Sequence, residues 1–138
     1  HALEIVRERR GVRFVNDSKG TNVDATLKAL ESIDQPIWLI AGGRDKGGDF
    51  SRLTQALSRR VTRVILIGEA APLLRLAWAG VATITDAATL RDAVELAAQE
   101  ASPGDVVLLS PACASFDMFA DYQDRGRQFK ALVHALPA

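Results

Sequence analysis

The chain has 138 residues, 48% of them hydrophobic, and its 17 lysines and arginines balance its 17 aspartates and glutamates. A chain of this length and composition can bury one hydrophobic core, which excludes a disordered segment and predicts a single domain over residues 1–138. A neutral domain has no general electrostatic attraction for nucleic acid or for anionic membranes, so neither is an expected partner.

The sequence also argues against membrane insertion and secretion. Its longest apolar runs are too short for a transmembrane helix, and the charges at Glu4 and 7–10 interrupt the one candidate signal peptide. The single cysteine, Cys113, cannot form an internal disulfide, so we expect a cytoplasmic protein. The first residue is His1 rather than methionine, which suggests a piece of a longer protein.

The chain opens with two predicted strands. Alternating apolar residues predict strands at 3–6 and 12–16, and Arg10-Gly11 is typical of a tight turn between them. The run 7–10 mixes both signs of charge, so we interpret it as a solvated strand end or turn.

A helix and a buried strand come next. Apolar residues at helical spacing predict a helix at about 23–32, with Thr21 or Asn22 as its N-cap. The continuous apolar run 37–41 is typical of a strand that is buried on both faces. A short helix capped by Ser51 is expected after this strand.

The second half of the chain alternates strand and helix in the same way. Strands are predicted at 64–67, 83–84 and 106–109, and helices at 70–78 and about 117–136. Thr85 or Asp86 is the expected cap of a further helix, which carries Leu90 and Val94 on its apolar face. Gly126 lies inside the last helix, where glycine costs about 1 kcal/mol relative to alanine. We therefore expect close packing at Gly126.

This alternation predicts an α/β fold. Strands that alternate with helices form a mostly parallel sheet with helices on both faces, here with one antiparallel edge strand. Ligands of such sheets bind at the carboxyl ends of the strands. Three segments that follow predicted strands should therefore meet at one edge: the first loop (17–22), the second loop (42–50) and the third loop (110–117).

The first loop combines a carboxylate, hydroxyls and an ammonium group just before a helix begins. Backbone N–H groups and the helix dipole make this position a natural anion site, to which Lys19 adds a positive charge. A capped turn with a solvated lysine is the alternative interpretation.

The second loop surrounds two cations with glycines. Four glycines allow the backbone to approach a ligand closely, and Arg44 and Lys46 could pair with a carboxylate or a phosphate. The loop is not an ATP phosphate loop, because Gly48 is followed by aspartate and phenylalanine instead of Lys-Ser/Thr. A flexible connection with exposed charges is the alternative.

The third loop carries small residues and then Ser115, which we expect to cap the last helix. Its hydroxyl and the N–H groups beyond it could hold a carboxylate, although a plain helix cap explains the serine equally well. Cys113 has no histidine nearby in the sequence to act as its base, so we interpret it as a buried small side chain. No metal-ligand cluster is recognisable.

The three loops together resemble the ligases of the Mur family that add D-glutamate. The matching stretches are Asn16-Asp17-Ser18-Lys19-Gly20-Thr21-Asn22, Gly42-Gly43-x-Asp45-Lys46-Gly47-x-Asp49-Phe50, Leu109-Ser110-Pro111-Ala112-Cys113-Ala114-Ser115-x-Asp117-x-Phe119 and Tyr122-x-x-Arg125-Gly126-x-x-Phe129. The resemblance covers essentially the whole chain, as the C-terminal domain of such a ligase, and implies a Rossmann-like fold.

The resemblance also implies a reaction in cell-wall (peptidoglycan) precursor synthesis. In a three-domain, monomeric ligase, ATP with Mg²⁺ converts the carboxylate of UDP-N-acetylmuramoyl-L-alanine to an acyl phosphate, and the amine of D-glutamate attacks it. The C-terminal domain brings D-glutamate and closes the site. ATP and Mg²⁺ are held mainly by the central domain, so the isolated chain should be inactive.

Residue roles follow from the same resemblance, position by position. The residues that would bind D-glutamate are Thr21, Lys46 and Ser115, with the backbone around Phe116 and Tyr122. The residues that would lie on the nucleotide side are Asp17 at the ribose, with Lys19 and Asn22 near the phosphates or bracing the loop. Two alternatives remain open: a sister ligase, such as one of the folylpolyglutamate type, and a stand-alone ligand-binding module.

Overall fold

The computed structural model describes residues 3–115 and 118–138. Its strands are Glu4–Arg9 (β1), Val12–Asn16 (β2), Ile37–Gly42 (β3), Val61–Ile67 (β4), Thr83–Asp86 (β5) and Val106–Leu109 (β6). Its helices are Val23–Glu31 (α1), Thr54–Arg60 (α2), Ala71–Trp78 (α3), Leu90–Glu100 (α4) and Tyr122–His134 (α5), with a 3₁₀ turn at Phe50–Leu53 (η1).

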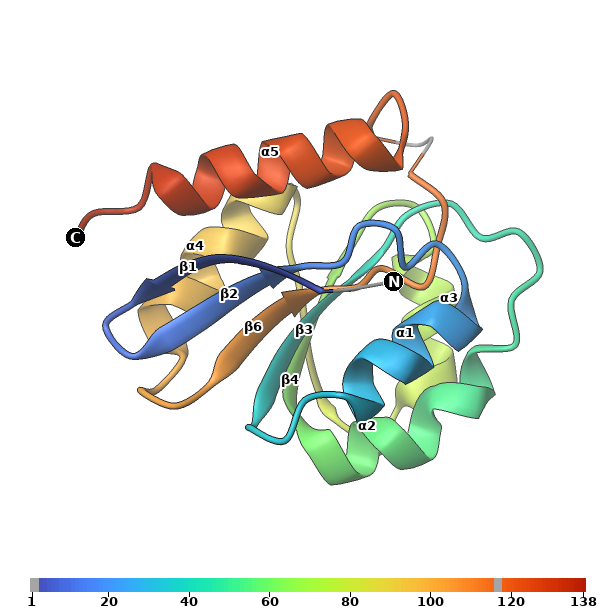
Figure 1. Ribbon diagram of the computed structural model, residues 1–138. Coiled ribbons are helices and arrows are strands. Elements are labelled where there is room, and N and C mark those ends of the chain that lie inside the picture. Colours follow the sequence, from blue (N-terminus) through green and yellow to red (C-terminus); the bar gives the residue numbers. More distant parts are fainter. Residues whose placement is uncertain (1–2, 116–117) are drawn as a thin grey trace.

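The strands form one sheet in the order β1-β2-β6-β3-β4-β5. β2, β6, β3, β4 and β5 are parallel, and only β1 runs antiparallel, against β2. The expected α/β fold with one antiparallel edge strand is therefore confirmed. Because β6 inserts between β2 and β3, the loops that follow these three strands leave the sheet next to one another (Figure 1).

Helices cover both faces of the sheet (Figure 1). On one face, α1, α2 and α3 enclose a core that includes Leu39, Leu66 and Leu108, all fully buried. On the other face, α4 and α5 enclose a second core. Every residue of β3 and of β6 is buried, as their continuous apolar sequences predict.

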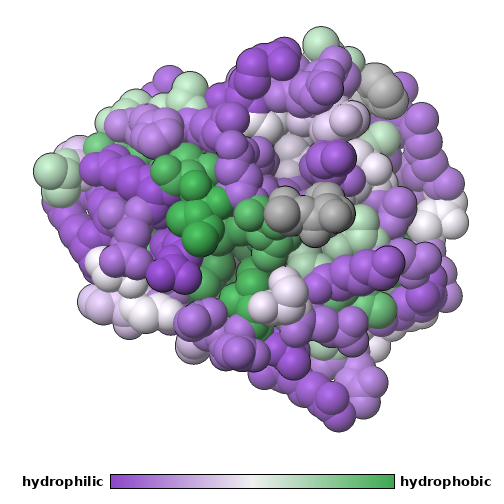
Figure 2. Space-filling view, in the orientation of Figure 1, coloured by the Kyte–Doolittle hydropathy of each residue, from purple (hydrophilic) through white to green (hydrophobic). Residues whose placement is uncertain are grey.

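One part of the first face has no helix over it. Leu3, Ile5, Val15, Ile33 and Val106 line a hollow of about 310 Å³ between the β1–β2 hairpin and the end of α1. Figure 2 shows apolar side chains gathered over this part of the sheet. The described helices thus leave apolar surface of the hairpin open to solvent on this side.

The predicted helix starts are right for α1 and wrong for α2 and α4. Asn22 caps α1, since its side chain accepts a hydrogen bond from Ala25 N. Asp49, not Ser51, caps η1, which leads into α2. Thr89, not Thr85 or Asp86, caps α4. The strand β5 continues through Asp86, so the helix cannot begin until the chain has left the sheet.

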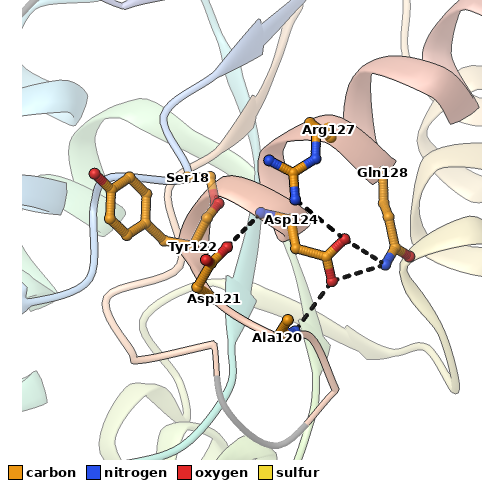
Figure 3. A network of polar contacts seen from close by, with 7 residues as sticks. All are labelled: Ser18, Ala120, Asp121, Tyr122, Asp124, Arg127 and Gln128. Carbon is orange, nitrogen blue, oxygen red and sulfur yellow. Dashed lines mark hydrogen bonds and ion pairs between the residues drawn. The ribbon is translucent and has the colours of Figure 1, made fainter.

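The last helix also begins later than predicted, at Tyr122. The chain first turns at Ser115, whose carbonyl accepts hydrogen bonds from Met118 N and Phe119 N. Asp121 then caps α5 by accepting from Asp124 N at 2.7 Å, while Asp124 accepts in return from Ala120 N (Figure 3). This reciprocal arrangement satisfies more backbone donors than a serine cap would. Ser115 is therefore not the cap of α5, and Asp117 lies outside the described residues.

The charged run 7–10 does more than end a strand in solvent. Arg7 Nη1 donates to the carbonyls of Val133 and Leu136, at 3.0 and 2.9 Å. Arg9 is buried, and its Nε donates to the carbonyl of Pro137. The solvated interpretation is therefore wrong for these two arginines, which tie β1 to the carbonyls at the end of α5.

Candidate functional site

The three loops meet at the carboxyl edge of the sheet, with the third loop in the middle. Ala112 N donates to Gly20 O at 2.8 Å, which joins the third loop to the first. Arg44 and Ala114 exchange backbone hydrogen bonds of 2.8 and 3.1 Å, which join the third loop to the second. These bonds join segments that are distant in sequence, so the three loops form one continuous rim.

A pocket of about 220 Å³ opens between the three loops, and we call it the three-loop pocket. Thr21 and Asn22 line it from the first loop, and Lys46 lines it from the second. The third loop contributes 112–114. The structure thus places a hydroxyl, an amide and an ammonium group from two separate loops around one small space.

Two arginines and three aspartates also line the three-loop pocket, and both arginines form ion pairs. Arg52 contacts Asp24 at 2.6 Å, and Arg44 contacts Glu69 at 3.0 Å. Asp45 is turned toward its own loop, where its Oδ1 accepts from the backbone N–H groups of the next two glycines. These hydrogen bonds form a tight turn around Lys46, whose side chain is exposed at the tip of the second loop.

The third loop supplies Ser115 beside the pocket. Ser115 directly follows Ala114, a pocket residue, and is 2% exposed, but it is not among the residues that line the described space. Phe116 lies outside the described residues. Cys113 is buried, as expected, and is one of the residues that line the pocket.

Lys19 and Tyr122 do not line the three-loop pocket that Thr21 and Lys46 share. Both line a second hollow of about 340 Å³, which we call the Lys19 hollow and which also includes Arg127 and Lys130. The structure therefore divides the predicted site residues between two separate spaces. The first loop serves both, because Lys19 and Thr21, two residues apart, line different hollows.

Asp17 is the buried first residue of the first loop. It is 2% exposed, and its Oδ2 accepts a hydrogen bond from Ser110 Oγ at 2.8 Å. Burial raises the pKa of the Asp17 carboxyl above its ordinary value, although the hydrogen bond from Ser110 and the charges of Lys19 and Arg125 act in the opposite direction. This placement ties the first loop to the start of the third.

The raised pKa of Asp17 predicts a pH-dependent effect of Asp17→Asn. The unfolded chain loses the Asp17 proton at lower pH than the folded chain does, so ionisation penalises folding as pH rises. Below the ordinary carboxyl pKa both states are protonated and the penalty vanishes. The free energy of unfolding of Asp17→Asn should therefore rise relative to wild type as pH increases from about 3, and level off once the folded-state carboxyl has ionised.

Urea unfolding of both proteins across this pH range checks the prediction. The other titrating groups are common to both chains, so they cancel in the difference. A difference that shrinks as pH rises would show that the carboxylate is stabilised by the fold instead of penalised.

Sequence reasoning missed the role of Arg125. The structure buries it completely in α5, with hydrogen bonds to Ser18 and to Cys113. The signal was present: position 125 follows Tyr122 by three residues and precedes Phe129 by four, so a charge occupies the apolar face of the helix. A buried charge of this kind needs several partners, and the first and third loops provide them.

Two kinds of feature are absent from residues 3–115 and 118–138. No three histidine, cysteine, aspartate or glutamate side chains gather there as metal ligands. No helix in that part of the chain is both long and apolar enough to cross a bilayer.

Known proteins resemble this chain over its whole length. The ligases named UDP-N-acetylmuramoylalanine–D-glutamate ligase from Geotalea uraniireducens and Desulfatibacillum aliphaticivorans are 52% and 48% identical to it, over 99% and 100% of the chain. The chain spans only 30% and 31% of the lengths of these two relatives.

A solved structure and a family model also resemble this chain. The solved structure of the MurF ligase of Thermotoga maritima in complex with ADP matches 93% of this chain and 29% of the MurF chain. The TM-score is 0.57 and the sequence identity is 15%, so this likeness concerns the fold alone. The family described as "Mur ligase, glutamate ligase domain" matches residues 3–113. The chain therefore belongs to the Mur ligase family and represents its C-terminal, glutamate ligase domain.

Proposed function

We propose that this chain is the D-glutamate-binding domain of an ATP-dependent ligase that joins D-glutamate to UDP-N-acetylmuramoyl-L-alanine. Relatives about half identical over its whole length are named for a D-glutamate ligase activity. Since the chain spans about 30% of their length, the remainder of the active site belongs to the rest of the ligase.

One observation carries the proposal: Thr21 and Lys46 line the same small pocket although they come from different loops. A free dicarboxylic amino acid needs partners for its charges when it leaves water. An ammonium group and a hydroxyl supply charge-assisted hydrogen bonds, and the N-terminus of α1, which begins at Val23 in the pocket wall, favours a carboxylate. Ser115 beside the pocket adds a further hydroxyl in this proposal.

Of the nucleotide-side residues, Lys19 lines the Lys19 hollow, whereas Asn22 lines the three-loop pocket. The hollow also carries Arg127 and Lys130, and its three cations suit a phosphate group, although these two already pair with carboxylates of the chain. Asn22 holds the N-terminus of α1 by accepting from Ala25 N, so we assign it to bracing the first loop. Asp17 begins that loop, and its Oδ2 accepts from Ser110 Oγ, so a contact with a ribose would have to involve its other carboxylate oxygen, Oδ1.

The described residues contain no cluster of metal ligands, and the second loop lacks the Lys-Ser/Thr of a phosphate loop. We therefore assign Mg²⁺ and most of the contacts with the phosphates of ATP to the part of the ligase outside this chain. The contribution of this domain is then positional: it holds the amine of D-glutamate toward the acceptor and excludes water.

Compartment and assembly follow from the same assignment. We propose a cytoplasmic, monomeric enzyme, and the lone cysteine Cys113 suits a reducing compartment.

A panel of amino acids offered to the full-length protein tests the function. Amide formation with UDP-N-acetylmuramoyl-L-alanine should require D-glutamate, and L-glutamate, L-lysine and diaminopimelate should not replace it. The purified 138-residue chain should neither form amides nor hydrolyse ATP. Preference for another amino acid would point to a sister ligase, and the absence of turnover in the full-length protein would point to a binding module.

A further inference from the structure

A fully buried arginine on the last helix connects two of the three loops. Arg125 Nε donates to Ser18 Oγ and Nη2 donates to Ser18 O, both at 2.9 Å. Its Nη1 donates to Cys113 O at 3.2 Å. The side chain is 0% exposed, so these hydrogen bonds form away from competing water.

The geometry of these bonds requires the guanidinium group. Its donors point in fixed directions within one plane, so a single side chain reaches the main chain of both loops at once. Ser18 extends the chain of bonds, because its hydroxyl donates to Tyr122 O at 2.6 Å. The first turn of α5, the first loop and the third loop are thereby held in one arrangement.

The first loop also packs directly on α5. A Cβ added to Gly126 would lie 3.1 Å from Asn16 Nδ2 and 3.4 Å from Ser18 Cβ, tighter than ordinary contacts. Glycine at this position lets the helix approach closely enough for its neighbour, Arg125, to reach the loop backbone.

Both anchored loops form walls of the three-loop pocket. Ser18 precedes Thr21 by three residues, and Cys113 is itself a pocket residue. Arg125 is not among the residues that line that pocket, so it can affect the shape of the pocket only through the two loops that it holds. A shift of either loop would change the distance between Thr21 and the 112–114 backbone.

We propose that Arg125 is a positioning residue for amino-acid binding: by clamping Ser18 to Cys113 it sets the width of the three-loop pocket. This inference rests on the proposed function, in which that pocket takes D-glutamate. It predicts that Arg125 controls how tightly D-glutamate binds without contacting it.

Arg125→Lys in the full-length protein tests the proposal, because lysine keeps the charge and loses the planar fork. The KM for D-glutamate should rise by about 10- to 100-fold, as expected when a binding group is misplaced by a small distance. The KM for the uridine nucleotide should stay within about twofold of wild type, and kcat should fall by less than the KM rises.

Val133→Ala is the matched control. Val133 is equally buried on α5, but its side chain belongs to the core packed against the sheet. This variant should lower Tm at least as much as Arg125→Lys and leave the KM for D-glutamate within about twofold of wild type. Ser18→Ala provides a second variant in case Arg125→Lys fails to fold, with an expected rise in that KM of about threefold or more from the lost hydroxyl bonds.

The outcomes separate the two proposals. A wild-type KM for D-glutamate in Arg125→Lys, or in Ser18→Ala if only that variant folds, would overturn the positioning role. The same holds if Val133→Ala raises the KM as much as Arg125→Lys does, since lost stability would then explain both. A full-length wild-type protein with no dependence on D-glutamate would overturn the proposed function itself, and the positioning role with it.

Discussion

Lys46→Ala in the full-length protein is expected to raise the KM for D-glutamate by about 10- to 100-fold, the cost of losing one or two charge-assisted hydrogen bonds. Lys46 lies in a turn shaped by Asp45, and it lines the three-loop pocket together with Thr21. The substitution removes the ammonium group without disturbing the core, because the side chain is exposed.

Steady-state kinetics with each substrate varied in turn provide the measurement. The KM for the uridine nucleotide should remain within about twofold of wild type, since the proposed function assigns none of its contacts to Lys46. Lys28→Ala is the matched control: it removes an exposed lysine from the last turn of α1, outside the pocket lining. Equal changes in both KM values, or equal effects of the two lysines, would contradict the assignment of Lys46 to D-glutamate.

The sheet could be predicted from the sequence because its central strands are apolar throughout, which favours burial in the middle of a sheet. The runs 37–41 and 106–109 are apolar without interruption, so only burial on both faces of a sheet satisfies them. Both are strands in the structure. The order of the strands was not predictable in the same way, because it depends on which helices cover which face.

Helix starts were less predictable, because several residues near each start can act as a cap. Thr85, Asp86 and Thr89 all precede α4, and only the length of β5 decides in favour of Thr89. At α5 the turn that begins at Ser115 delays the helix until Asp121 can cap it. Local sequence cannot resolve such choices when the deciding contacts come from the sheet or from a turn.

The meeting of the three loops was predictable, and the division of their side chains was not. Loops that follow parallel strands gather at one edge of a sheet, and the structure brings Thr21 and Lys46 to one pocket there. The separate position of Lys19 depends on the backbone direction within a short turn. The clamp made by Arg125 depends on the distance between α5 and the loops, which no local pattern encodes.

Gly42→Ala is expected to destabilise the domain by about 4 kcal/mol or more, which is a large part of the total stability of an ordinary domain. Gly42 ends β3 with a φ of +128°, a conformation that side chains rarely adopt. An added Cβ would lie 1.8 Å from the carbonyl oxygen of Ile67, at the end of the neighbouring strand β4. Because the obstacle is backbone, it cannot move aside without separating the two strands.

Gly80→Ala separates this steric effect from the effect of backbone conformation. Gly80 also has a positive φ, of +76°, but an added Cβ there would meet no atom within 4 Å. It should therefore cost only the strain of a left-handed residue, about 1 kcal/mol. Urea unfolding of the purified chain gives both values, and similar losses in the two variants would refute the close approach of β3 to β4 at Gly42. That approach matters for the site, because Gly42 is where the backbone leaves the sheet toward Lys46, so a displaced β3 end would displace the second loop as well.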